Sequence, residues 1–205
     1  MTDKKKSPVE GFKESSDFLR GEIPAELCDD NDHFGSGSIQ LLKFHGTYQQ
    51  DNRDERAAAR AAGDSTKRHS FMVRTRIPGG RLTSHQLLAH LDLGDQFGNG
   101  TIRLTSRQAI QLHGVLKNQL RDVLREIDQM QLTTLGACGD VNRNVMCCPG
   151  PYSDSVHQQL QALAQQLAES FAPQTGAYRE IWLVDEETGE KESISGGSEV
   201  EPLYG

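Results

Sequence analysis

Residues 100–114 alternate between two kinds of side chain, and this alternation limits the folds that the chain can adopt. Successive side chains of a β-strand point to opposite faces, so a two-residue period indicates a strand. One set of positions is mostly apolar and can face a core: Ile102, Leu104, Ser106, Gln108, Ile110 and Leu112. The other set is rich in hydrogen-bond donors and contains no carboxylate: Arg103, Thr105, Arg107, Ala109, Gln111 and His113. We therefore expect one strand with a buried face and an anion-holding face.

A second strand of the same character is expected at residues 71–77. One of its faces is apolar, and the other presents Arg74 and Arg76. Each of the two strands is followed by apolar residues spaced by three and four, over residues 84–97 and 116–130, with Thr83 as the candidate N-cap of the first helix. The strand–helix–strand–helix order predicts an α+β fold in which helices cover one face of a sheet.

The uncovered face of that sheet would gather four arginines, namely Arg74, Arg76, Arg103 and Arg107. A solvated surface is the ordinary explanation, but such a surface usually mixes both signs of charge. Arginine is planar and permanently charged, which suits it to bidentate contacts with carboxylates or phosphates. The net charge of the chain is −7, so nucleic acid and anionic membranes are not expected partners. The sequence therefore predicts a local anion site in an acidic protein.

The remaining segments give weaker patterns. We expect strands at residues 39–48 and 181–184, helices at residues 51–62 and 152–172, and a loop at residues 24–37. Asp154 is a possible cap of the last helix. Residues 140–145 are expected to form a loop that places Arg143 between Asn142 and Asn144. The acidic, glycine-rich residues 185–198 are expected to form a hairpin or a surface loop.

Several classes of protein are disfavoured by composition. The sequence contains no apolar run long enough to span a membrane, and its charged first residues do not resemble a secretory signal. The four cysteines form no Cys-x-x-Cys pair, so we expect neither a disulfide framework nor a zinc site, and a reduced cytoplasmic setting is the default. The acidic residues 29–32 lack the ligand spacing of a calcium-binding EF-hand loop.

Five stretches, in this order along the chain, resemble the haemoproteins of the sulfite and nitrite reductase family: residues 44–53, 74–80, 103–108, 111–114 and 140–145. Residues 181–183 also fit, and the likeness covers most of the chain from about residue 12. The resemblance implies a ferredoxin-like half-domain, with an antiparallel sheet and helices on one face, followed by the start of a domain for sirohaem and a [4Fe–4S] cluster. We expect the N-terminal arm at residues 1–65, the half-domain at residues 66–138 and the truncated cofactor domain at residues 139–205.

The same resemblance implies roles for individual residues. Arg74 and Arg143 would face the substrate, where they would bind the sulfite oxyanion and stabilise charge as its S–O bonds break. The carboxylates of sirohaem would be bound by Arg103, Arg107, Gln111 and His113, with Arg76 as a weaker candidate. Tyr48 is a further candidate for the cofactor site, and Asn142 and Asn144 are expected to hold the Arg143 loop.

The family also implies cofactor ligands that this sequence does not supply. A [4Fe–4S] cluster needs four cysteine thiolates in spaced pairs. Cys28, Cys138, Cys147 and Cys148 do not match that pattern, so we expect the cluster ligands to lie outside this chain and assign no metal ligand here. The 205 residues are expected to be the N-terminal portion of an enzyme, inactive when isolated.

Three alternatives remain open at this point, one of them a purely structural helper of a longer sulfite reductase. Nitrite reductases of the same family differ where His113 and residues 142–145 stand, which favours sulfite as the substrate. A non-catalytic module could use the same arginines to bind a phosphorylated metabolite or a protein. The expected electron donor is either ferredoxin or a flavoprotein reductase, and the sequence does not distinguish them.

Overall fold

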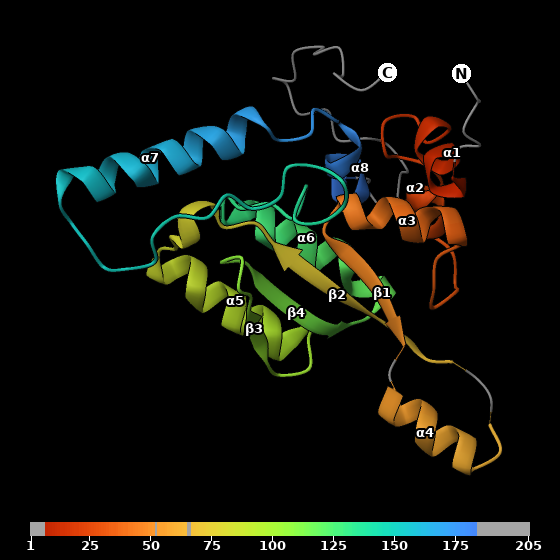
Figure 1. Ribbon diagram of the computed structural model, residues 1–205. Helices are drawn as coiled ribbons and strands as arrows, with labels where there is room; N and C mark the ends of the chain where they lie inside the picture. Colours follow the sequence, from red (N-terminus) through yellow and green to blue (C-terminus); the bar gives the residue numbers. More distant parts are fainter. Residues whose placement is uncertain (1–6, 52, 65–66, 184–205) are drawn as a thin grey trace.

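A computed structural model describes residues 7–51, 53–64 and 67–183 of the chain (Figure 1). Its elements follow in chain order: α1 (Pro8–Glu14), α2 (Ile23–Glu26), α3 (Ser36–Phe44), β1 (Thr47–Asp51), α4 (Arg53–Ala61), β2 (His69–Thr75), the short 3₁₀ helix η1 (Pro78–Gly80), α5 (Ser84–Gln96), β3 (Ile102–Leu104), β4 (Ile110–Val115), η2 (Lys117–Gln119), α6 (Leu120–Gln129), α7 (Ser155–Ser170) and α8 (Ala177–Leu183).

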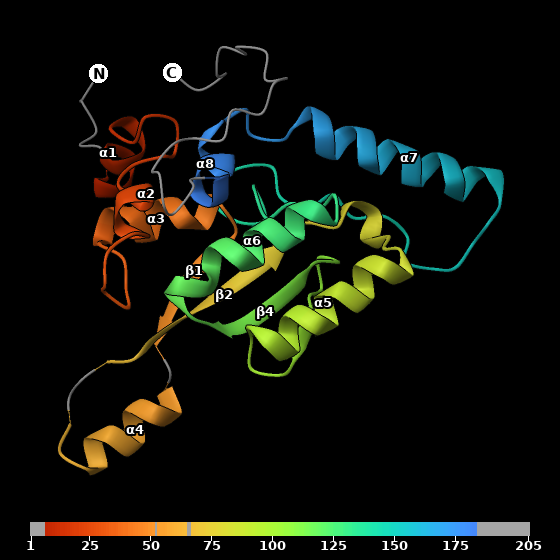
Figure 2. The ribbon, with the colours of Figure 1, turned by 180° about the vertical axis from the view of Figure 1, so that it is seen from behind.

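The strands form one four-stranded sheet in the order β1-β2-β4-β3, and every neighbouring pair is antiparallel. Helices α5 and α6 lie against one face of this sheet, as seen from behind in Figure 2. The α+β fold and the antiparallel sheet with helices on one face are therefore confirmed. Helix α4, at the tip of the long connection between β1 and β2, projects away from the rest of the molecule (Figure 1).

The hydrophobic core lies between the sheet and α6. Phe71 and Val73 of β2 and Val115 of β4 are fully buried there. Ile127 of α6 is also fully buried. Phe71 also packs edge-on against Phe34, with ring centroids 5.5 Å apart. Burial of each such side chain stabilises the fold by roughly 1.5–3 kcal/mol. The apolar set expected on β2 is thus the set that faces the helices.

Residues 100–114 form a β-hairpin rather than the single strand that we expected. Strand β3 ends at Leu104, the chain turns, and β4 begins at Ile110. The turn includes Gln108 at φ 56°, a left-handed conformation that the alternating pattern does not reveal. In the hairpin Arg103 lies directly opposite Gln111 and Ile102 opposite Leu112, so these residues still separate onto two faces. The expected division fails elsewhere, because Leu104 is 72% exposed and Ala109 is buried.

Two of the other expected strands are also wrong. The segment 39–48 begins in helix α3, which buries Ser38, Leu41 and Leu42 at helical spacing, and only its end enters β1. The break between them is at Gly46, where the backbone is left-handed at φ 71° and a Cβ would lie 2.3 Å from a backbone oxygen. Residues 181–183 belong to helix α8, not to a strand.

The expected helices are found close to their predicted bounds. Thr83 caps α5 in a reciprocal capping box with Gln86, and Asp154 caps α7 by accepting from two backbone N–H groups. The apolar stripe of α7 is nevertheless exposed: Val156, Leu160, Leu163, Leu167 and Phe171. The expected loop at residues 24–37 also differs, because α2 occupies its first residues and α3 begins at Ser36.

The hairpin or loop expected at residues 185–198 lies outside the described residues. Within the described part of the chain, none of the helices has the length and apolar character needed to cross a membrane.

Candidate anion-binding site

The face of the sheet opposite α6 carries a row of polar side chains that crosses all four strands. Arg74 on β2 and Arg103 on β3 both pair with Gln111 on β4, one from each side. Directly opposite residues in an antiparallel sheet have Cβ atoms about 5 Å apart. Strand alternation thus brings together two guanidinium groups and one amide from segments about 30 residues apart in the sequence. We call Arg74, Gln111 and Arg103, together with Tyr48 and His113, the open-face row.

Gln111 links the members of this row by hydrogen bonds. Its amide oxygen faces the Arg74 guanidinium, accepting from Nε at 2.9 Å and from Nη2 at 2.6 Å, and its nitrogen donates to Nε2 of His113 at 3.3 Å. The Nδ1–H of His113 donates in turn to Oε1 of Gln50 at 3.2 Å. Gln111 therefore orients the Arg74 side chain, and both ring nitrogens of His113 have a side-chain partner.

Arg74 is also held from two other directions. Its guanidinium carbon lies 5.7 Å from the centre of the Tyr48 ring, and its Nη1 donates to the Ala137 carbonyl at 3.4 Å. The hydroxyl of Tyr48 contacts the thiol of the buried Cys138. Burial, together with the nearby charge of Arg143, lowers the pKa of Arg74 below its ordinary value. The charge of Arg143 therefore acts on a member of the open-face row.

The row concentrates positive charge without a compensating acid. Among the described residues, no aspartate or glutamate forms an ion pair with Arg74, Arg103 or Arg143. Burial lowers the pKa of His113, and the cations Arg103 and Arg74 lower it further. A fixed group of cations, a neutral imidazole and oriented amides favours an anion in their midst.

Asn144 joins the Arg143 loop to the sheet. It is buried, and its Oδ1 accepts from the N–H of Ile77 at 2.9 Å. Its Nδ2 donates to the carbonyls of Ile77 and Arg107, both at 2.8 Å. The predicted role of Asn144 in positioning the loop has this structural basis, whereas Asn142 is exposed and has no side-chain hydrogen bond to any described residue. Arg107 lies in the exposed hairpin turn rather than on a strand.

Arg76 does not share the open face, although it has the same strand parity as Arg74. Only 3% of it is exposed, and it donates from Nη1 to the Leu135 carbonyl and from Nη2 to the Ala168 carbonyl. Ala168 lies in the last turn of α7, where the helix dipole favours a cation. The segment around Leu135 and the end of α7 cover this end of the face, which the strand pattern alone does not predict.

Sequence reasoning missed three contributors to the site: Gln50, Ala137 and Cys138. Gln50 follows Tyr48 by two residues, so the two-residue period of a strand predicts that both lie on the same face of β1. Ala137 contributes only a backbone carbonyl, for which the sequence has no signal. The four cysteines are free, with Cys138 buried and Cys28 and Cys148 exposed.

Comparison with known proteins places this geometry in a family. Residues 64–130 match the family model described as the nitrite/sulfite reductase ferredoxin-like half domain. The sulfite reductase (NADPH) hemoprotein beta-component of Staphylococcus saprophyticus is 44% identical over 198 residues, which are 96% of this chain and 34% of the relative. The corresponding protein of Bacillus pumilus is 43% identical over 97% of this chain and 34% of its own length.

A fungal relative and a solved structure agree with these matches. The sulfite reductase (NADPH) subunit beta of Schizosaccharomyces pombe is 44% identical over 96% of this chain and 13% of its own length. The Mycobacterium tuberculosis NirA protein superposes with a TM-score of 0.65 at 22% identity, over 81% of this chain and 32% of that structure, which shows a shared fold. The chain spans about a third of the length of the bacterial relatives that it matches. Residues 64–130 of this chain therefore form a ferredoxin-like half domain of the nitrite and sulfite reductase family.

Proposed function

We propose that this chain is part of the haemoprotein of a sulfite reductase and that its open-face row binds the carboxylates of sirohaem. One observation supports this proposal above the others: Arg74, Gln111 and Arg103 form a continuous row of donors with no paired acid among the described residues. A tetrapyrrole rich in carboxylates satisfies such a row through charge-assisted hydrogen bonds. The relatives from Staphylococcus saprophyticus and Schizosaccharomyces pombe are sulfite reductases by name, which supports sulfite over nitrite as the substrate.

The residues present fit the carboxylates of sirohaem. Arg103, Gln111 and His113 would hold them along β3 and β4, with Arg107 contributing from the adjacent turn and Tyr48 from β1. Arg76 is omitted from this proposal because only 3% of it is exposed, beneath the segment around Leu135 and the end of α7. We assign Asn142 no contact with the cofactor; it is exposed and precedes Arg143 in the sequence.

The cysteines do not fit a [4Fe–4S] cluster. All four belong to the described part of the chain, and no three of them come together with metal-ligand spacing there. A cluster needs four thiolates at one site. We therefore propose that the cluster ligands belong to sequence beyond these residues, and we assign the cluster no role through this chain.

Arg74 and Arg143 are the proposed substrate-binding residues. Their guanidinium groups are close enough for one to lower the pKa of the other, so an oxyanion between them would relieve a repulsion. The same two cations would stabilise the negative charge that develops on oxygen during reduction. Bound sirohaem would supply the electrons, and the NADPH in the names of the relatives favours a flavoprotein over ferredoxin as the donor.

A chimeric haemoprotein tests these roles directly. Residues 1–205 replace the matching segment of the Staphylococcus saprophyticus relative, and sulfide formation and the Soret absorption of sirohaem are both measured. We expect Arg103→Ala to reduce the sirohaem content of the purified chimera. Arg143→Ala should instead leave the Soret band in place and lower kcat/KM for sulfite by roughly 10²–10³-fold, as expected for a lost charge-stabilising donor.

The control is Arg125→Ala on α6, an arginine on the helix-covered side of the sheet. It should leave both measurements unchanged. Equal activity in the Arg143→Ala and Arg125→Ala chimeras would overturn the substrate role. A chimera that retains no sirohaem but binds phosphate tightly through the same arginines would instead support the non-catalytic anion-binding module.

A further inference from the structure

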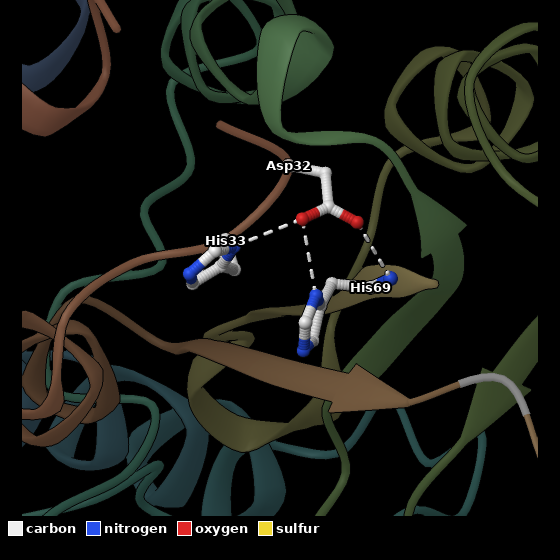
Figure 3. Close-up of side chains that lie close together, drawn as sticks. All are labelled: Asp32, His33 and His69. Carbon is white, nitrogen blue, oxygen red and sulfur yellow. Dashed lines mark hydrogen bonds and ion pairs between the residues drawn. The ribbon is translucent and has the colours of Figure 1, made fainter. Parts of the chain in front are cut away.

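Two histidines and an aspartate meet where the loop after α2 reaches the first residue of β2 (Figure 3). Oδ1 of Asp32 lies 2.9 Å from Nδ1 of His33 and 3.2 Å from Nδ1 of His69. The two imidazole rings lie side by side with their centres 5.0 Å apart and their planes tilted by 38°. One ligand atom from each residue falls within 4.8 Å of the other two. Two imidazole nitrogens therefore converge on a single carboxylate oxygen.

We propose that Asp32, His33 and His69 bind a divalent transition-metal ion of the Zn²⁺ type. A tetrahedral ion with bonds of about 2.0–2.1 Å keeps its ligand atoms roughly 3.3 Å apart. The two nitrogen–oxygen distances of 2.9 Å and 3.2 Å are close to that separation. Imidazole nitrogen with a single carboxylate suits zinc, nickel and related ions better than calcium or magnesium, which prefer oxygen ligands.

The loop that carries two of the ligands is held on both sides of them. Before Asp32, the Lys117 ammonium donates to Oδ1 of Asp29 at 2.5 Å and to the Asn31 carbonyl at 2.9 Å. After His33, Phe34 is buried against the core, and its N–H donates to Gln49. The backbone N–H of His69 also donates to Oδ2 of Asp32 at 3.2 Å. Little further ordering is needed to bring the three ligand atoms around one ion.

The cluster is accessible to an ion from solvent. The side chains of Asp32 and His33 are 55% and 50% exposed, whereas that of His69 is 16% exposed. Three protein ligands leave the fourth tetrahedral position for water. Binding would replace the protons that Nδ1 of each histidine now shares with the carboxylate, so both histidines would coordinate as neutral imidazoles.

This site is independent of the open-face row. His69 precedes Arg74 by five positions on an extended strand, a distance of about 16 Å, and it has the strand parity of Phe71 and Val73. The imidazole therefore belongs to the opposite side of β2 from the sirohaem-binding surface that we propose. Occupancy of one site can be measured without the other.

Zinc competition against a chromophoric chelator tests the proposal on the 205-residue chain. The wild-type chain should remove one Zn²⁺ from the chelator, and His33→Ala and His69→Ala should each weaken this by about tenfold or more. His157→Ala is the matched control, because His157 also pairs with an aspartate, at 2.6 Å, but belongs to no group of three ligands in the described part of the chain. It should bind zinc like the wild type.

Two further measurements distinguish this site from misfolding of a variant and from zinc binding by cysteine thiolates. Zinc should raise the thermal midpoint of unfolding of the wild type and not that of His33→Ala. The His33 side chain is 50% exposed, so its replacement leaves the fold intact. Co²⁺ in place of Zn²⁺ should give visible bands without the near-ultraviolet charge-transfer band of thiolate ligation. Zinc affinity that is unchanged in the His33→Ala, His69→Ala double variant, a thiolate band, or no zinc binding by the wild type would each overturn the proposal.

Discussion

The two faces of the sheet are made from the same strands, yet one is closed and apolar and the other is open and cationic. On β2, Phe71 and Val73 are buried against the helices, and Arg74 points to the other side. On β4, Leu112 is in the core, while Gln111 contacts Arg74 and His113. A single-residue step along either strand moves from one environment to the other.

This contrast separates the origin of stability from the origin of binding. Apolar burial on the closed face favours folding, whereas the cations of the open face are partly desolvated without a paired acid, which opposes it. The lowered pKa of Arg74 reflects this unfavourable desolvation of its charge. Substitutions on the closed face should therefore change the free energy of unfolding, and substitutions on the open face should change affinity for anions.

The largest effect is expected from Phe71→Ala. The side chain is fully buried and packs edge-on against Phe34, so its loss should lower the free energy of unfolding by about 4 kcal/mol. Urea denaturation followed by circular dichroism measures this change. Ser70→Ala, on the same strand but half-buried, is the control and should cost less than about 1 kcal/mol. Similar losses in the two variants would contradict the assignment of the core to this face.

Asn144→Ala should have the next largest effect. It removes an amide that bonds the N–H of Ile77 and the carbonyls of Ile77 and Arg107, leaving buried backbone groups without partners. We expect a loss of about 3 kcal/mol in the free energy of unfolding. Asn142→Ala provides a matched comparison two residues away, and because Asn142 is exposed its cost should stay below about 0.5 kcal/mol. Equal losses of unfolding free energy in the two variants would show that Asn144 does not link the loop to the sheet.

Acid should destabilise the fold through His45, the fully buried C-cap residue of α3. Complete burial lowers its pKa from about 6.5 to about 4, so the unfolded chain takes up a proton before the folded chain does. The stabilisation is complete above about pH 6.5 and is lost as the pH falls toward 4. Between pH 7 and pH 4.5 this costs about 2 kcal/mol. Urea denaturation at both values measures the loss.

His45→Gln should reduce this acid sensitivity because the variant has no imidazole to protonate. His113→Gln is the open-face comparison: the pKa of His113 is also lowered, with the same sign of effect, but its ring is only partly buried. The His113 variant should therefore retain most of the acid sensitivity. If His113→Gln reduced the acid sensitivity more than His45→Gln, protonation on the open face, and not of the buried His45, would limit stability in acid.

Sequence reasoning succeeded where neighbouring residues determine the structure. The caps at Thr83 and Asp154 are formed by residues within three positions of each other, so their patterns are readable locally. The expected separation of Arg103 and Gln111 from Ile102 and Leu112 also survived the error about the hairpin, because these residues pair directly within each set. It failed at Leu104, which is 72% exposed at the end of the edge strand β3.

Sequence reasoning failed where contacts with distant segments determine the local structure. The turn around Gln108 is held by Cys147, whose N–H and carbonyl bond the Gln108 side chain from 39 positions away. The burial of Arg76 depends on Ala168 in α7, which no strand pattern can indicate. The helix α8 replaces an expected strand because Ala177, Tyr178 and Ile181 are buried at helical spacing against a core built from other segments. In each case tertiary contacts override local propensity.

The smallest effect on stability, and the sharpest on the open face, is expected from Arg103→Ala. Arg103 is exposed and pairs with no acid among the described residues, so the free energy of unfolding should change by less than about 0.5 kcal/mol. Its charge nevertheless contributes to the lowered pKa of His113, which should rise in the variant. Titration of the His113 ring protons by nuclear magnetic resonance measures this shift. Arg125→Ala, on the helix-covered side, should leave the His113 pKa unchanged. If the His113 pKa is unmoved in Arg103→Ala, the two side chains do not share one electrostatic site, and Arg103 has no place in the open-face row.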